Sequence, residues 1–285
     1  TWSAQAAWGL YNQYIVSMNT QEFEFNQFLD YYYPLHGVEP SQSVHYMAGV
    51  EKRLNASNTL SVDLYYKDIR HTYMFDLLQS QYEVFALSDK VVAGQGSTLG
   101  MELMWKGQVG KVSGWASYTL SKSTRSFPHI MNGDWYDYDY DRRHSFKAVA
   151  NYQATQRISY SASFRALSGV PRSVENAMQM YYMYDPLTGT MIYSPQYTVD
   201  RKNATRMPWL FYLDLGLEKE VVSGFGKDIS RFFGADRSYF TLDVYNVLFF
   251  RRNILYYIPT GGADLFIPMG DNYLPGVSAG YTIKF

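Results

Sequence analysis

The chain contains no cysteine, which excludes disulfide bonds, thiolate metal sites and thiol catalysis. No segment approaches the run of about 18 apolar residues that a membrane-spanning helix requires. Neither sign of charge dominates, since 25 Lys and Arg face 26 Asp and Glu, so nucleic acid is not an expected partner. No secretory leader pattern opens the 285 residues, and we expect a mature protein or a piece of one.

Aromatic residues, in contrast, are abundant. They make up 18% of the chain, with 28 Tyr, 17 Phe and 6 Trp. Tyr and Trp suit the boundary between water and membrane, where a ring needs an apolar body and a wet tip. The alternative is a Tyr-rich secreted or binding β-protein.

Apolar and polar residues alternate with period two along most of the chain. The final segment shows it best, with Val277, Ala279, Tyr281, Ile283 and Phe285 on one face. Ten segments are expected to be strands: 3–15, 43–54, 59–69, 97–106, 111–120, 144–154, 157–166, 209–218, 237–248 and 276–285. Nearly all their charges lie opposite the apolar face, as expected if one face meets lipid and the other water. Alternation alone would also suit a soluble sandwich.

The connections between these segments decide for the membrane. Short turns at 55–58, 107–110 and 154–156 alternate with long connections at 16–42, 70–96, 121–143, 167–208 and 249–274. Compact soluble domains rarely contain so many long loops, whereas outer-membrane barrels combine short periplasmic turns with long outside loops. The exception is 222–236, a longer stretch on the predicted periplasmic side. We therefore expect an antiparallel transmembrane β-barrel in a bacterial outer membrane, with long loops extracellular and the short turns and C-terminus periplasmic.

Several motifs resemble, in order, the C-terminal half of the barrel of TonB-dependent outer-membrane receptors of Bacteroidetes-type bacteria. They lie at 46–51 (YMAGVE), 64–69 (LYYKDI), 116–123 (ASYTLSKS), 139–144 (DYDRRH), 243–253 (DVYNVLFFRRN) and 280–285 (GYTIKF). The resemblance implies a 22-stranded barrel plugged by an N-terminal domain. On that basis residues 1–285 form one transmembrane β-barrel domain, the C-terminal portion, without the plug. The residues alone also allow a closed, stand-alone barrel of ten strands.

The function implied by the resemblance is TonB-energised uptake of a scarce solute, such as a siderophore, metal complex, cofactor, glycan or peptide. This chain would supply wall and substrate-capturing outer loops. Its expected partners are outer-membrane lipids, the N-terminal barrel and plug of the same receptor, TonB through the plug segment, and a surface lipoprotein. The alternative is a stand-alone barrel that acts as an adhesin or binding protein, or as a surface protease. No cofactor is expected.

The connection at 127–143 is the first candidate binding site. It places Trp135, Tyr136 and Tyr138 among several aspartates, an arrangement that could stack a sugar or an aromatic ligand. The alternative is that the rings pack on neighbouring loops while Asp–Arg pairs fix the rim. The motif residues Asp139, Asp141, Arg142 and Arg143 favour this structural role.

Two more aromatic clusters fall in predicted outer loops. They comprise Tyr31, Tyr32 and Tyr33 in one loop and Tyr181, Tyr182 and Tyr184 in another. They either line a binding vestibule or belong to an interfacial girdle. The methionines of the second loop could offer soft ligands to copper or fill an apolar gap.

Metal and catalytic sites are not expected. The five histidines show no paired metal-ligand spacing and would hold a metal or haem only if they converge in space. Asp141 and His144 are the one tempting catalytic pair, but no nucleophile motif such as Gly-x-Ser-x-Gly accompanies them.

Overall fold

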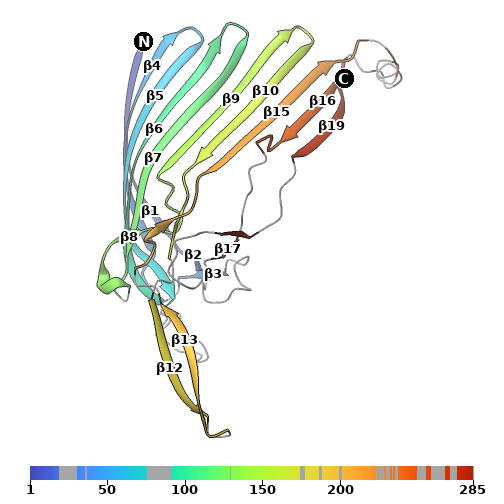
Figure 1. Ribbon diagram of the computed structural model, residues 1–285. Coiled ribbons are helices and arrows are strands. Elements are labelled where there is room, and N and C mark those ends of the chain that lie inside the picture. Colours follow the sequence, from blue (N-terminus) through green and yellow to red (C-terminus); the bar gives the residue numbers. More distant parts are fainter. Residues whose placement is uncertain are drawn as a thin grey trace.

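The computed structural model describes residues 1–18, 31–35, 37–75, 91–128, 130–173, 177–185, 188–198, 201–222, 224, 228, 232, 234, 237–248, 255–257, 267–269 and 275–284. Ten strands form its main antiparallel sheet (Figure 1): β1 (Trp2–Gln13), β4 (Ser41–Asn55), β5 (Asn58–Phe75), β6 (Val91–Val109), β7 (Val112–Ser126), β9 (His144–Thr155), β10 (Ile158–Leu167), β15 (Leu210–Glu220), β16 (Arg237–Tyr245) and β19 (Gly276–Lys284). Each strand pairs with the next of these along the chain. The all-β, antiparallel prediction is confirmed. No helix among the described residues is long and apolar enough to cross a membrane.

Three of the connections are short turns, as predicted, but each has only two residues, and 107–109 and 154–155 belong to strands rather than to turns. Asn55 caps the turn at 56–57, because its Oδ1 accepts from the Ser57 amide at 2.9 Å. Thr155 caps the turn at 156–157 through its Oγ1, which accepts from the Ile158 amide at 3.1 Å. The turn at 110–111 uses Gly110 at φ +60°, a conformation that glycine adopts without strain. All three turns lie at the end of the sheet where β1 begins and β19 ends (Figure 1).

At the opposite end the predicted strand limits are wrong in detail. Strands β5, β6 and β7 run several residues further than expected, so parts of 70–96 and 121–143 are strand rather than connection. Strand β16 is shorter than expected, because Asn246 takes a left-handed φ of 56° and its amide donates to Asp214.

The other long connections are not free of structure. They contain β2 (Ile15–Met18) paired with β3 (Tyr31–Pro34), β11 (Pro171–Arg172) with β14 (Thr205–Arg206), β12 (Ala177–Asp185) with β13 (Thr190–Thr198), and β17 (Leu255–Tyr257) with β18 (Ile267–Met269). The 3-10 turn η2 (Met131–Gly133) and β8 (Tyr136–Asp137), which pairs with β7, complete the set. Most of the predicted 222–236 stretch lies outside the described residues.

The apolar face of the sheet is exposed rather than buried. Trp8 is 65% exposed and Val277 is 68% exposed. Within the described residues the buried hydrophobic side chains are Val16, Phe127, Tyr136 and Ala166. A soluble sandwich would cover this face with a second layer, and an exposed apolar surface of this extent marks an interaction site. The described residues therefore do not form a soluble sandwich.

Strand registers order the exposed face into rows that cross the sheet. One row, toward the long connections, contains Trp8, Tyr46, Tyr66, Leu99 and Lys122 on five successive strands. Another, toward the short turns, contains Trp2, Lys52, Leu60, Trp105 and Ala116. Apolar residues fill the rows between them. Two positions beyond the first row, the same face is polar on β5, β6 and β7, with Asp68, Ser97 and Thr124, whereas β1 and β4 keep Leu10 and Val44 there.

The described sheet is open. Strand β1 pairs with β4 on one side, β19 pairs with β16, and the strand order does not join β1 to β19. Figure 1 shows these two strands at opposite margins of a curved wall. The alternative of a closed ten-stranded barrel is not what the described residues form.

Candidate functional site

A cluster of charged side chains ties together three segments at the long-connection end of the sheet. We call it the rim cluster, and its members are Asp137, Asp139, Asp141, Arg143, Lys202, Asn203 and Arg206. Asp141 lies at its centre and is only 1% exposed. Its Oδ1 accepts from the Ser123 amide of β7 at 2.6 Å, and its Oδ2 accepts from Arg143 at 3.3 Å and from Arg206 at 2.5 Å.

Two arginines share two carboxylates in this cluster. Arg143 and Arg206 each contact both Asp137 and Asp141, so a single guanidinium joins β8 to the segment that precedes β9. Burial lowers the pKa of Arg206, but hydrogen bonds to Asp141 and Asp137 outweigh this effect, so its pKa lies above the usual value. The shared charges hold the 137–143 segment against the segment that carries β14.

Asn203 extends the rim cluster through a left-handed backbone at φ 56°. Its Nδ2 donates to the Asp137 carbonyl at 2.7 Å and to the Asp139 carboxylate at 2.6 Å. Lys202 approaches the same Asp139 carboxylate at 3.6 Å. Asp139, Asp141 and Arg143 therefore make the contacts expected of residues that fix the rim.

Sequence reasoning did not find Lys202, Asn203 or Arg206. Arg206 lies 65 positions from Asp141 and belongs to no motif or periodic pattern. No local signal in the sequence could have identified these residues as partners of the 137–143 segment.

The predicted aromatic residues of this connection have different surroundings. Trp135 is exposed, whereas Tyr136 is 7% exposed and packs inward. Tyr138 is half-buried under the Arg125 guanidinium, 4.0 Å from its ring centre, and meets Tyr140 edge-on. Burial raises the pKa of both Tyr136 and Tyr138. Tyr136 is a packing residue of the rim, while ligand binding by Trp135 and Tyr138 stays a prediction.

The other predicted aromatics lie on two separate hairpins. Tyr31, Tyr32 and Tyr33 belong to β3, and Tyr181, Tyr182 and Tyr184 belong to β12. The β12–β13 hairpin projects away from the sheet in Figure 1. Tyr184 is exposed, and the side chains of the other five lie outside the described part of the structure. Their role in binding stays a prediction.

The tempting catalytic pair is not assembled. Asp141 uses its oxygens on Ser123, Arg143 and Arg206, while Nδ1 of His144 contacts the Tyr118 hydroxyl at 2.8 Å. His144 also stacks on Trp209 at the exposed apolar face. No group of His, Asp and Glu among the described residues has metal-binding geometry, and His36 and His129 lie outside them.

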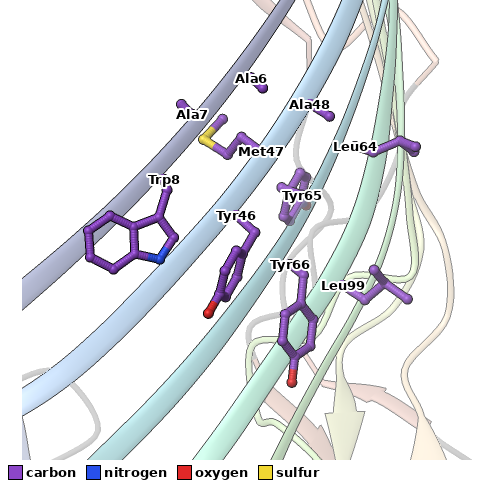
Figure 2. Close-up of a pocket in the computed structure, with 10 residues that line it drawn as sticks. All are labelled: Ala6, Ala7, Trp8, Tyr46, Met47, Ala48, Leu64, Tyr65, Tyr66 and Leu99. Carbon is purple, nitrogen blue, oxygen red and sulfur yellow. The ribbon is translucent and has the colours of Figure 1, made fainter.

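A shallow groove of about 550 Å³ lies on the wall away from the rim cluster. It extends over β1, β4, β5 and β6, and ten residues line it (Figure 2): Ala6, Ala7, Trp8, Tyr46, Met47, Ala48, Leu64, Tyr65, Tyr66 and Leu99. By register, Ala6, Ala48 and Leu64 form one row and Trp8, Tyr46, Tyr66 and Leu99 form the next. The groove is therefore mostly a feature of the exposed apolar face.

Comparison with known proteins supports the fold. No protein-family model matches the sequence, and no curated protein matches it. Among solved structures, the chain is similar to the closed form of the ferric-catecholate import receptor Fiu from E. coli K12, with a TM-score of 0.50 and 17% identity. The match covers 87% of this chain and 29% of the receptor chain. At this identity the likeness concerns the fold alone, and the chain spans less than a third of the receptor's length.

Proposed function

We propose that this chain forms part of the wall and the outer rim of an outer-membrane receptor that imports a scarce solute with energy from TonB. The observation that carries the proposal is the exposed apolar face, which is bounded by a row of rings on each side. Trp8, Tyr46 and Tyr66 lie in one boundary row, and Trp2 and Trp105 lie in the other. Aromatic rows on both sides of an apolar band are typical of outer-membrane barrels.

The separation of these rows fits a membrane. Trp2 and Trp8 are six residues apart on β1, and the same interval separates the two rows on β4, β5, β6 and β7. This interval corresponds to about 20 Å along a strand. The apolar band of an outer-membrane barrel is about 25 Å tall, so the two rows lie within the span of such a band.

The two open margins support a larger barrel around this wall. Strands β1 and β19 each present one unpaired edge within the described sheet. An open strand edge in hydrocarbon leaves backbone groups without partners, which is why spanning sheets close. The proposal therefore places the remaining barrel strands against β1 and β19, with a plug inside, TonB acting on the plug, and a surface lipoprotein at the mouth.

In this proposal the long connections face the outside and the short turns face the periplasm. The rim cluster then serves the mouth of the receptor by holding the 137–143 and 201–207 segments in one arrangement. Trp135, Tyr138 and Tyr184 remain available to contact an arriving solute, which we expect to be a siderophore, metal complex, cofactor, glycan or peptide.

Two arginine substitutions, one on β15 and one on β10, test the membrane assignment. Leu215 is an exposed residue of the apolar face near the middle of β15, and Ser161 pairs with the next residue, Gly216, on the polar face. Leu215→Arg should lower assembly into the outer membrane, because a cation on lipid near mid-membrane costs about 2–4 kcal/mol. Ser161→Arg should assemble normally, since Asp243 lies close to the same space.

Assembly of the full-length receptor is measured by membrane fractionation and by the heat-dependent gel shift of a folded barrel. Equal recovery of both variants would refute the lipid-facing assignment, and so would stronger loss with Ser161→Arg.

A further inference from the structure

The β12–β13 hairpin forms an arm whose two strands have, within the described residues, no neighbour on their outer sides. Each strand has nine residues, whereas the other strand pairs of the long connections have two to four residues per strand. Figure 1 shows the arm projecting away from the main sheet. A lone two-stranded hairpin is only marginally stable in water, so a third strand would stabilise the arm.

The foot of the arm is anchored to the rim cluster. Strands β11 and β14 pair at this foot, and the Met207 amide donates to the Val170 carbonyl at 2.9 Å. The Asn203 amide donates to Oγ of Ser173 at 3.1 Å, and Arg206 of β14 contacts the rim carboxylates. A ligand on the arm is therefore held next to the rim.

The two outer edges of the arm differ in their backbone donors. Proline lacks an N–H and fits in a sheet only where its nitrogen points away from the neighbouring strand. Pro195 of β13 pairs with Met180 of β12, so the outer edge of β13 lacks a donor at this position. In such a pair both residues point their backbone groups outward. Met180 and every second residue around it, Met178, Tyr182 and Tyr184, therefore present N–H and C=O groups on the outer edge of β12.

The sequence of β12 does not protect this edge. Natural sheets protect exposed edges with charged residues, with proline or with very short strands. Strand β12 contains no proline, and its only charged residue is the last one, Asp185. Its unpaired row of alternating N–H and C=O groups is the pattern that an extended main chain matches by strand addition.

Charges mark the two ends of the arm. Asp185, at the tip, is the only charged residue between 177 and 198. Arg172 lies five positions before β12 begins, and Arg201 lies three positions after β13 ends. Both arginines are exposed and make no ion pair among the described residues. The arm therefore combines an acidic tip, an uncharged edge and a basic foot.

We propose that the edge of β12 binds a free oligopeptide of about ten residues as an antiparallel third strand. The proposal rests on the proposed function and deepens it by naming an oligopeptide as the solute. An antiparallel peptide begins where β12 ends, so its α-amino group lies at the acidic tip and its carboxylate at the basic foot. Main-chain hydrogen bonds give the affinity, so peptides of many sequences are accepted.

The backbone row and the charged ends together select a free peptide over other occupants. A sugar or a metal complex lacks an alternating row of N–H and C=O groups. A folded partner protects its own edges, and a strand inside its chain has no free termini for Asp185 and Arg172. A second copy in the same membrane presents β12 in the same direction, whereas antiparallel pairing requires opposite directions.

The test measures peptide binding to the intact protein in phosphatidylcholine nanodiscs by isothermal titration calorimetry. The probe is a decapeptide of alternating Thr and Ser with free ends, so that its main chain and termini are what the protein recognises. Tyr182→Pro should raise the dissociation constant about tenfold, because it removes an outward N–H and places a ring against the peptide. Tyr193→Pro is the matched control, since Tyr193 pairs with Tyr182 and its nitrogen points to the outer edge of β13. It should bind the probe like the parent.

Changes to the probe test the backbone and the ends separately. Methylation of every backbone nitrogen should abolish binding, whereas methylation of alternate nitrogens leaves one edge intact and should preserve it. Acetylation and amidation of the ends should weaken binding about tenfold, because both charge-assisted contacts are lost. Arg172→Ala should remove most of the response to amidation. Arg157→Ala, at an exposed arginine of a short turn, should leave that response unchanged.

Several results would overturn the proposal. These are equal losses in Tyr182→Pro and Tyr193→Pro, unchanged binding of the fully methylated probe, or two receptor copies joined through β12. Equal binding of the capped and free probes, or a folded protein that stays on β12 in excess probe, would replace the free peptide by a protein partner. A protein that assembles as a barrel yet binds no probe would refute the peptide site alone. A protein that fails to assemble in membranes would refute the proposed function instead.

Discussion

Removal of the Asp141 carboxylate should loosen the rim cluster by about 2–3 kcal/mol. The Ser123 amide donates to Asp141 at 2.6 Å, and leaving this donor unpaired in a buried place costs about 1–3 kcal/mol. Arg143 and Arg206 lose one acceptor each, but their side chains are 29% and 31% exposed and keep Asp137. Solvent screening limits that loss to under about 1 kcal/mol. Together these losses amount to about 1–4 kcal/mol, so about 2–3 kcal/mol is the central expectation, toward the lower end of the ~3–5 kcal/mol of a fully buried broken pair.

Hydrogen exchange at the Ser123 amide reports this loss directly, because that amide is the donor to Asp141. In the intact protein, Asp141→Ala should speed its exchange roughly 30- to 150-fold, the factor that corresponds to about 2–3 kcal/mol of local opening free energy. Asp134→Ala is the matched control, since Asp134 is an exposed aspartate of the same connection. It removes the same charge without touching Ser123.

The reasoning is refuted if Ser123 exchanges at the parent rate in Asp141→Ala. It is also refuted if Asp134→Ala speeds the exchange equally, because the effect would then come from net charge and not from the buried contact.

Three further predictions concern the same wall and rim. Burial raises the pKa of Tyr136, so the folded rim holds the Tyr136 proton more tightly than the unfolded chain does. The stability that this proton contributes is complete below the usual phenol pKa of 10.0 and is lost as pH rises beyond it. Absorbance titration and thermal melts between pH 9 and 12, compared with Tyr136→Phe, check this. Asn203→Gly keeps the left-handed backbone but loses both Nδ2 hydrogen bonds, and Asn203→Ala loses the same bonds and adds backbone strain. Protease nicking in the rim should therefore increase in Asn203→Gly and increase further in Asn203→Ala. The opposite order would refute this reasoning. Gly100→Val should lower the free energy of unfolding in urea by about 1–3 kcal/mol, because a Cβ at this position would lie 2.3 Å from the Tyr65 ring. The double variant Gly100→Val with Tyr65→Ala removes this clash, and restored stability there would verify the cause.

The strands could be predicted from the sequence because their signal is local. Period-two alternation is visible wherever one face meets an apolar surface, and all ten predicted segments are strands. The signal fades where strands rise beyond the apolar band. Residues 91–96 contain two glycines that suggest a connection, yet Gly94 lies under the side chain of Phe127, which follows β7, and Gly96 lies under that of Arg125 from β7. Glycine there admits a large neighbour and does not break the strand.

The rim cluster could not be predicted, because its contacts join residues that are far apart in the chain. The sequence places Asp137, Asp139 and Asp141 among aromatic residues and suggests a ligand platform. In the fold these carboxylates are occupied by Arg143, Lys202, Asn203 and Arg206. Charges that look available in a sequence are often already paired across a loop, and only tertiary structure shows their partners.

The three two-residue turns have a consequence for how the wall is built. Each turn carries its own cap or glycine, so the pairs β4–β5, β6–β7 and β9–β10 can zip from their turns without help from distant residues. Joining one pair to the next instead requires closure of a long segment, such as residues 168–209 between β10 and β15, at an entropic cost that grows with its length. The hairpin is therefore the natural unit of assembly. We expect the wall to grow two strands at a time, with the long connections taking shape only after neighbouring hairpins have met.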